Sequence, residues 1–256
     1  MRPQVPTQNY SQRRIRSVAG VKRLFKRVVQ RIAGKHYQEE HFIDLIRLAQ
    51  QDGCERALDV GCGYGEKLKL LQSIGLDVVG IDINHDAVQA NSDAGFKCLM
   101  PQDFTGSSDV YDLIIMSHII EHFAPKDLLQ FMDSYLVHLK VGGYLLIATP
   151  MPSSVFFYDF DHIRPYPPEA LDEIFVQSRP QVQFVSKHQL ELIDIRMRRR
   201  SLLIGRSVYW QMKRPKILGL AKNVAGRLYR YSCGTIGQAD GWLGLYRNKG
   251  LRNKQG

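Results

Sequence analysis

Residues 57–71, ALDVGCGYGEKLKLL, hold an acid and three alternating glycines between a strand-like run and a helix-like pattern. Glycine at such a junction lets backbone N–H groups come close to a bound ligand. The glycines Gly61, Gly63 and Gly65 do not follow the GxGxxG spacing of dinucleotide-binding turns, because the sixth position is Glu66. The turn also lacks the Gly-Lys-Ser/Thr ending of a Walker A loop. This glycine turn is therefore expected to bind a ligand other than a pyrophosphate or triphosphate.

Acidic side chains around the turn indicate the charge of that ligand. Asp59 and Glu66 lie on either side of the glycines, where carboxylates repel phosphate and compete for the same N–H groups. They suit a cationic ligand, and S-adenosylmethionine has an ammonium, a sulfonium and no phosphate. Asp82 ends the next strand-like run, where a carboxylate can accept from both ribose hydroxyls, and Asp103 follows the third run and can accept from the adenine amine. S-adenosylmethionine is therefore the predicted cofactor.

The elements that must position these residues alternate between strand and helix from Arg56 onward. Such alternation predicts parallel βαβ units in a doubly wound sheet, which binds ligands at the carboxyl ends of its strands. The predicted strands span 56–60, 77–82, 97–100, 111–117 and 143–149, and the predicted helices about 65–74, 84–94 and 125–139. Further along, PYPPEALDEIF predicts a helix, and LELIDIRMR and WLGLYRNK predict the last two strands.

Five segments in series resemble a known family. LDVGCGYG, VVGIDI, PQDF, YDLIIMSHIIEH and LKVGGYLLIATP are similar, in order and spacing, to the motifs of class I SAM-dependent methyltransferases, and DHIRPYPPEAL extends the likeness more weakly. The resemblance implies an α/β, Rossmann-like sheet of seven strands in the order 3-2-1-4-5-7-6, with strand 7 antiparallel. It also implies a set of cofactor-binding residues. These are Asp59, Gly61, Gly63 and Gly65 for the methionine portion, Asp82 and Ile83 for the ribose and adenine, Asp103 for the adenine, and Ser117 for the exposed side of the cofactor.

The segment SHIIEH, after the fourth predicted strand, contributes candidate catalytic residues. His118, Glu121 and His122 stand at i, i+3 and i+4, so a helical turn would put all three on one face. This spacing can bind a divalent metal, and some branches of the resembled family carry a similar cluster for that purpose. A hydrogen-bonded turn that packs the sheet edge is the alternative interpretation. The predicted site includes no metal.

A further candidate, His162, lies in the aromatic loop FFYDFDHIRPYPP after the fifth predicted strand, which should cover the acceptor pocket. It is the predicted general base, with Asp159 or Asp161 orienting its ring. A surface histidine on a lid is the alternative.

The segment SHIIEH also indicates which kind of atom is methylated. In the resembled family, methylation of base amines goes with a motif like (N/D)PP(Y/F) after the fourth strand, and cytosine C5 methylation needs a cysteine there; this chain has SHIIEH. The predicted function is O-methylation of a small-molecule or glycan hydroxyl, for example on a lipid-linked or cell-envelope saccharide. In this respect the chain resembles the ubiquinone-type and O-antigen-type branches of the family. An RNA methyltransferase and a non-catalytic SAM-binding adaptor are the alternatives.

Charge is segregated along the 256 residues. Residues 1–35 hold ten basic side chains and no acid, and residues 196–256 hold fifteen basic side chains and one acid, Asp240, whereas the part between is acidic. The apolar residues interleaved in both basic ends predict peripheral contact with an anionic membrane. RNA phosphates and an acidic protein are the alternative partners.

These patterns divide the chain into three predicted parts. Residues 1–50 form a basic, amphipathic helical extension with helices over 11–33 and about 36–50, residues 51–150 form the SAM-binding half, and residues 151–256 form the acceptor half, with a basic insertion at about 206–240. Four cysteines without a CxxC pair favour reduced thiols. Because no run is long enough to span a membrane and the start lacks an apolar signal core, we expect a cytoplasmic protein, peripheral at the inner face of the membrane.

Overall fold

The computed structural model describes residues 37–153, 156–177, 182–201, 216–232 and 236–252. The chain divides into two compact units. The larger comprises Glu40–Arg198 and Ala239–Gly256, and the smaller Met1–Glu39 and Arg199–Gln238. The helix predicted over 11–33 lies outside the described residues.

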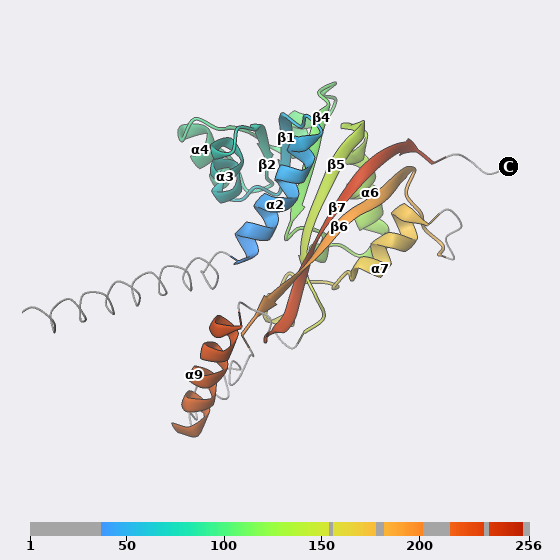
Figure 1. The fold of residues 1–256 in the computed structure, drawn as a ribbon. Coiled ribbons are helices and arrows are strands. Elements are labelled where there is room, and N and C mark those ends of the chain that lie inside the picture. The colour runs from blue at the N-terminus through green and yellow to red at the C-terminus, as the bar shows by residue number, and fades with distance from the viewer. Residues whose placement is uncertain (1–36, 154–155, 178–181, 202–215, 233–235, 253–256) are drawn as a thin grey trace, which may run out of the picture. The chain divides into compact units, whose positions relative to one another are not determined.

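A seven-stranded sheet forms the centre of the larger unit, and its order, β3-β2-β1-β4-β5-β7-β6, is the predicted one (Figure 1). The pairs β1–β2, β1–β4, β2–β3 and β4–β5 are parallel, whereas β5 and β7 are antiparallel, as predicted. The strands are β1 (Arg56–Val60), β2 (Asp77–Ile81), β3 (Lys97–Leu99), β4 (Tyr111–Ser117), β5 (Leu139–Pro150), β6 (His188–Arg200) and β7 (Gln238–Leu251).

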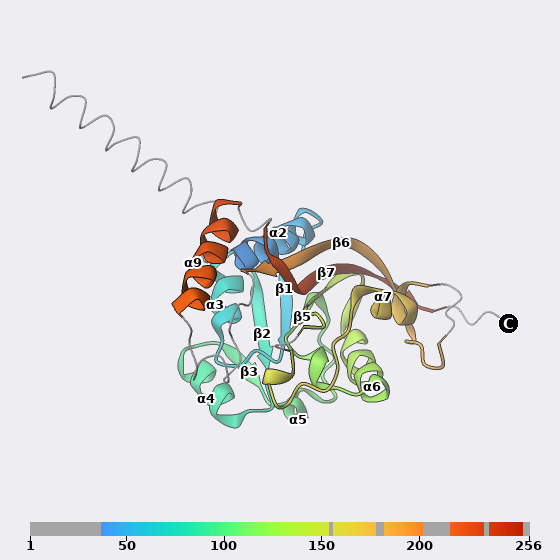
Figure 2. The ribbon, with the colours of Figure 1, turned by 90° about the horizontal axis from the view of Figure 1, so that it is seen from below.

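Helices cover both faces of this sheet. The helical elements that precede β6 are α2 (Tyr37–Gln51), α3 (Glu66–Ser73), α4 (His85–Asp93), α5 (Pro101–Phe104), the 3₁₀ turn η1 (Ile120–His122), α6 (Pro125–Leu136), the 3₁₀ turn η2 (Phe156–Tyr158), α7 (Pro168–Leu171) and the π-helical turn η3 (Asp172–Val176). The helix α9 (Lys216–Tyr231) belongs to the smaller unit. One core cluster joins α2 and α3 to one face, and the other joins α6 and α7 to the opposite face (Figure 2). Near-continuous apolar strands such as Ile114–Met116 are typical of a sheet buried on both faces.

Local signals explain where several of these elements begin and end. Pro125 and Pro168 open α6 and α7, where proline loses no helical hydrogen bond. The Asn84 side chain accepts from the first-turn N–H groups of α4. Gly75 and Gly95 have φ values of 91° and 87° and close the predicted helices before them, because this backbone conformation favours glycine. These signals are local, so the sequence shows them directly.

The smaller unit contains α9, which falls within the predicted basic insertion between β6 and β7. Within this unit, the Tyr229 hydroxyl donates a hydrogen bond to the Arg199 carbonyl, at 2.7 Å. Of the helices in the described ranges, none has the length and apolar character needed to cross a membrane.

Candidate functional site

Parallel strands bring the predicted site residues together at the carboxyl ends of the strands. The carboxyl ends of β1, β2 and β4 lead into the glycine turn, into Asp82 and into the SHIIEH segment, respectively. Thr149, near the carboxyl end of β5, lies on the same side of the sheet. The sheet therefore gathers residues that are far apart in the sequence.

Asp59 is a buried acid whose carboxylate makes no hydrogen bond with the residues that the structure describes. Its side chain is 1% exposed. Burial raises its pKa to about 7, an effect that Lys67 opposes and Asp82 reinforces. Because an unpaired buried carboxylate is costly, its presence here fits a ligand that supplies a cation. The ammonium of S-adenosylmethionine is such a group.

Asp82 holds the glycine turn to the second strand. Its two carboxylate oxygens accept from the backbone N–H groups of Gly63, at 2.7 Å, and of Asn84, at 2.8 Å. Each oxygen keeps a second lone pair, so these bonds leave acceptor capacity for ribose hydroxyls. Asn91, which is 2% exposed, completes the turn by donating from Nδ2 to the Gly63 carbonyl at 2.8 Å.

The three glycines of the turn have different surroundings. All have positive φ, and a Cβ built on Gly61 would lie 2.6 Å from Cδ1 of Ile119, whereas one on Gly65 would collide with the Asn91 carboxamide. A Cβ on Gly63 would meet nothing within 4 Å. Two glycines thus allow close packing inside the protein, and the middle one faces open space. A backbone cradle of this kind, above a buried acid, fits the methionine portion of the cofactor.

We expect Gly65→Ala to damage the turn more than Gly75→Ala, although both glycines have positive φ. A side chain at such φ costs about 1–2 kcal/mol in either variant. Only at Gly65 must Asn91 also move, which breaks its bond to Gly63, worth about 1 kcal/mol. Gly65→Ala should therefore melt lower and bind adenosylhomocysteine at least about tenfold more weakly, while Gly75→Ala keeps its affinity. Thermal melting and calorimetry measure both effects, and equal affinities would contradict the role of Asn91.

The remaining predicted cofactor residues also lie next to strand ends. Ile83, which is 83% exposed, follows Asp82 and leaves its side chain available to cover an adenine. Asp103 is exposed in the single turn of α5, just after β3. Ser117 is buried as the last residue of β4. Their roles toward the cofactor stay predictions.

The structure corrects the predicted helical turn over His118, Glu121 and His122. Only Ile120–His122 is helical, as a 3₁₀ turn, and His118 precedes it with a φ of 57°. Arg198 donates from Nη1 to Nε2 of His118 at 2.8 Å, and Nδ1 of His118 lies 3.1 Å from Oε1 of Glu121. Because arginine only donates, Nε2 of His118 accepts this bond, which leaves Nδ1 to donate to Glu121. Both ring nitrogens of His118 are thus engaged in hydrogen bonds, and its catalytic role stays a prediction.

Glu121 is fully buried and still ionised. Burial acts to raise its pKa, but the bonds from His118 and from Thr149 Oγ1, the latter at 2.9 Å, hold the pKa below its ordinary value. Its backbone carbonyl accepts from the N–H groups of Ile163 and Arg164, at 2.9 and 3.2 Å. Glu121 therefore places a negative charge at the strand edge and also holds the loop that carries His162.

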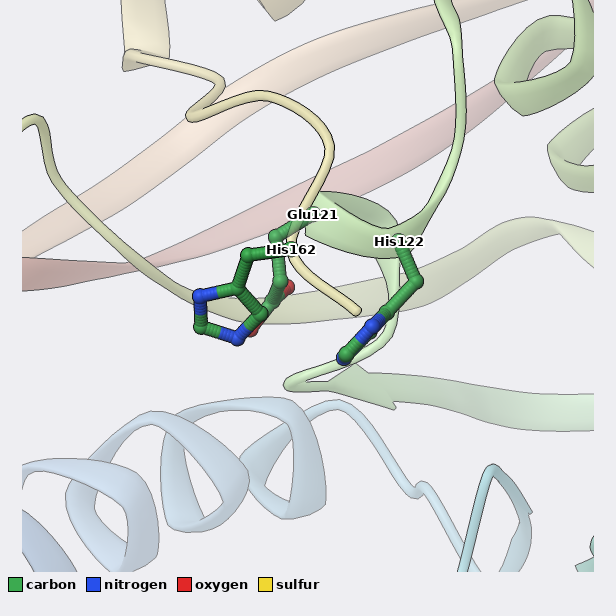
Figure 3. Close-up of side chains that lie close together, drawn as sticks. All are labelled: Glu121, His122 and His162. Atoms are coloured by element: carbon green, nitrogen blue, oxygen red, sulfur yellow. The ribbon is translucent and has the colours of Figure 1, made fainter. Parts of the chain in front are cut away.

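His122 and His162 have the same hydrogen-bonding arrangement. Nδ1 of His162 lies 2.7 Å from the Phe156 carbonyl, and Nδ1 of His122 lies 3.1 Å from the Asp161 carbonyl. A carbonyl only accepts, so both rings carry their proton on Nδ1 and keep a lone pair on Nε2. The rings meet edge to face, with centroids 5.0 Å apart, beside the Glu121 carboxylate (Figure 3). Asp159 Oδ2 lies 3.6 Å from Nε2 of His162 and would stabilise a protonated ring.

Glu121, His122 and His162 each offer one ligand atom, and these atoms all lie within 4.8 Å of one another. Two imidazole nitrogens whose Nδ1–H groups are held by carbonyls, together with one carboxylate, form a donor set that divalent transition metals accept. His162 thus takes the place that the sequence interpretation gave to His118 in a metal-binding cluster.

Sequence reasoning missed Arg198, Thr149 and Asn91. Arg198 binds the buried Asp240 through Nε, at 3.2 Å, and reaches His118 from β6, so it is fixed by contacts across the sheet. One signal was available: Asp240 is the single acid among residues 196–256, which suggests a specific partner. A second signal was available at Asn91, a polar residue on the same face of α4 as the buried Ala87. Thr149 offered none.

Comparison with known proteins identifies related chains. A family model described as a methyltransferase domain matches residues 19–217. The chain is 26% identical over 102 residues to the ubiquinone biosynthesis O-methyltransferase of Brucella ovis, a match that covers 37% of this chain and 40% of that protein. The homologous enzyme of Mesorhizobium japonicum matches with the same identity and coverage. The chain thus spans about two fifths of the length of these curated relatives.

Solved structures show the same fold at low identity. The N-methyltransferase NodS from Bradyrhizobium japonicum, in complex with S-adenosylhomocysteine, is 13% identical with a TM-score of 0.52, over 87% of this chain and 97% of that one. A putative methyltransferase from Bacillus halodurans is 16% identical with a TM-score of 0.51, over 82% and 98% of the two chains. These neighbours support the seven-stranded architecture.

Proposed function

This chain belongs to the methyltransferase domain family of S-adenosylmethionine-dependent enzymes, and from that membership we propose that it methylates a hydroxyl oxygen of a small molecule or glycan. The observation that carries the choice of oxygen is the pair of imidazole Nε2 lone pairs beside Glu121. An amine attacks with its own lone pair, whereas a hydroxyl must lose a proton, so a proton acceptor favours a hydroxyl substrate. The name of the Brucella relative is consistent with this proposal.

The chain's residues divide the work of binding and proton transfer. When bound, S-adenosylmethionine supplies an electrophilic methyl group on a positively charged sulfur. We assign Asp59 to the ammonium, the glycine turn to the methionine portion, and Asp82 to the ribose. Nε2 of His162 would take the hydroxyl proton of the acceptor as the C–O bond forms and the methyl–sulfur bond breaks, and Asp159 would stabilise the resulting imidazolium. Glu121 adds a negative charge that favours the same protonation.

A labelling experiment tests the proposed reaction. Purified protein is incubated with cell extract and an isotopically labelled methyl donor, and the products are analysed by mass spectrometry. We expect the label in an O-methyl group of a small molecule or glycan. Label in ribonuclease-sensitive material would instead support an RNA methyltransferase, and the absence of any transfer despite cofactor binding would support an adaptor. Either outcome overturns the hydroxyl proposal.

We further propose that the acceptor is lipid-linked, with α9 contacting the anionic membrane surface where it resides. One face of α9 exposes a stripe of large apolar side chains: Leu220, Val224, Leu228 and Tyr231. The described side chains of the helix also include Lys222 and Arg227, and its sequence holds no acid. Apolar residues beside cations suit an interfacial helix, in which each cation near anionic headgroups contributes about 1 kcal/mol. A cytoplasmic setting stays a prediction, supported by Cys54, Cys62 and Cys98 being free thiols.

Flotation with liposomes tests this contact. The protein should float with phosphatidylglycerol vesicles at low salt, lose that binding as salt rises, and ignore neutral vesicles. Leu220→Glu combined with Leu228→Glu should lower the bound fraction at least about tenfold, because each leucine is worth about 1.5–3 kcal/mol when buried. Val141→Glu, which changes a 75% exposed apolar residue in β5, is the control. Retention on RNA but not on vesicles would contradict the proposal.

A further inference from the structure

Among the strands that the structure describes, β6 is the last in the sheet order and has no described strand on its outer side. It runs for 13 residues and contains no proline. In the described part of the chain, the backbone of residues 189–195 makes no hydrogen bond outside the sheet. Protein edges are usually protected by short strands, prolines or bulges, because an open edge can pair with another strand. This long edge is therefore suited to pairing.

One face of β6 is apolar and exposed at three alternate positions. Ile193, Ile195 and Met197 are 38%, 37% and 38% exposed, and they point to the same side because side chains alternate along a strand. The charges on β6 are also divided along its length. Its acids, Glu191 and Asp194, precede all of its arginines, which occupy positions 196, 198, 199 and 200. A strand of this kind complements a copy of itself that runs in the opposite direction.

We propose that β6 pairs antiparallel with the β6 of a second copy of this chain, about a two-fold axis at Ile195. In this register Ile195 faces Ile195 of the second copy, and Ile193 faces Met197. Two charged positions also face opposite charges, since Asp194 faces Arg196 and Glu191 faces Arg199, whereas Arg198 and Arg200 face leucines. Asp194 binds Arg196 of its own chain at 2.8 Å and Glu191 binds Lys249 at 3.1 Å, so the contacts across the axis would extend these ion pairs. Apolar and opposite-charge pairs across antiparallel strands are stabilising. The two sheets would join into one continuous sheet.

Charge and symmetry select this register over its neighbours. A two-fold axis normal to the sheet puts the same face of both strands on the same side. One residue must therefore lie directly opposite its own copy, with the axis between them. An axis at Asp194 would place two aspartates opposite each other, and an axis at Arg196 would do the same for two arginines. Like charges in direct opposition destabilise a pair. Parallel pairing fails for the same reason, because it sets acids beside acids.

The mass of the full-length protein in solution is the first test, and it is independent of the proposed reaction. Sedimentation should give about twice the chain mass of 29.3 kDa. Ile195→Arg places two cations on the axis and should yield the single-chain mass. Val137→Arg alters a 61% exposed valine outside β6, at the end of α6, and should leave the dimer intact. Unchanged binding of adenosylhomocysteine shows that both variants are folded.

Disulfide trapping tests the register. Directly opposed residues in antiparallel strands have Cα atoms about 4.5–5.5 Å apart, within the range that a disulfide spans. Ile195→Cys should therefore cross-link to itself on mild oxidation. Ile193→Cys alone should not, but it should cross-link when mixed with Met197→Cys. A wild-type monomer at micromolar concentration, a dimer that survives Ile195→Arg, or a dimer without these cross-links would overturn the proposal.

Discussion

Asp59→Asn should lower the affinity for S-adenosylmethionine at least about a hundredfold while leaving the melting temperature at pH 8 no lower. Asparagine has nearly the same shape but no charge, so a bound ammonium loses its buried partner. Breaking a buried charge pair costs about 3–5 kcal/mol, and 1.4 kcal/mol corresponds to tenfold. The free protein, in contrast, no longer carries an unpaired buried carboxylate. Calorimetry and thermal melting measure the two effects.

The pH dependence of cofactor binding provides an internal check on Asp59. Its pKa of about 7 exceeds the ordinary value of 3.8, so the folded protein binds more protons than the unfolded chain between these values. The free energy of unfolding contributed by this group therefore falls as pH rises from about 4 to about 7. A cationic ligand selects the ionised form, so cofactor affinity should rise about tenfold per pH unit below pH 7 and level off above it. A wild-type affinity that is independent of pH, or an Asp59→Asn variant with wild-type affinity, would remove Asp59 from the site.

His162→Ala should lower kcat by about a hundredfold to ten-thousandfold, the range that a general base contributes, with cofactor affinity unchanged. The reason is that the bond from Nδ1 to the Phe156 carbonyl holds the ring, while Nε2, 3.6 Å from Asp159 Oδ2, is the nitrogen proposed to take the proton. His138→Ala is the matched control, because His138 makes the same kind of bond, to the Asp109 carbonyl at 3.0 Å, but lies at the start of β5. Steady-state kinetics and calorimetry separate the two effects.

Removal of metal distinguishes the two uses of the Glu121–His122–His162 cluster. If His162 is the base, dialysis against EDTA should leave kcat unchanged. A loss of activity that Mn²⁺ restores, together with Mn²⁺ binding that His162→Ala abolishes, would make the three residues a metal centre. Full activity in His162→Ala would also exclude His162 as the base.

The sequence predicted most of the fold because each signal for it was local. Alternating strands and helices, Gly75 and Gly95 after their helices, and Pro125 at the start of α6 are all readable within a few residues. The strand order followed from the resemblance of the motifs, and the structure confirms it. The last two strands are longer than predicted, since β6 and β7 extend beyond the segments that showed a strand pattern.

The sequence named Glu121, His122 and His162 as candidates, but it did not show that they lie together, and it gave no role to Arg198, Thr149 or Asn91. His118 has the spacing of a helical turn with Glu121, yet it adopts a positive φ, and Arg198, 80 residues away, binds its ring. His162 joins Glu121 and His122 through a loop whose path depends on the Glu121 carbonyl. Contacts of this kind depend on three-dimensional packing, which a pattern of residue types in one chain does not reveal.

The attachment of the His162 loop to Glu121 has an evolutionary consequence. Backbone bonds from Ile163 and Arg164 anchor the loop next to its histidine, so the anchor does not depend on which side chains the rest of the loop carries. Phe157, Tyr158 and Phe160, in contrast, are at least 58% exposed on the same loop. In the proposed reaction, substitutions at these three positions would change the range of accepted substrates while His162 stays where it is, so descendants of this gene could acquire new substrates and keep the same base.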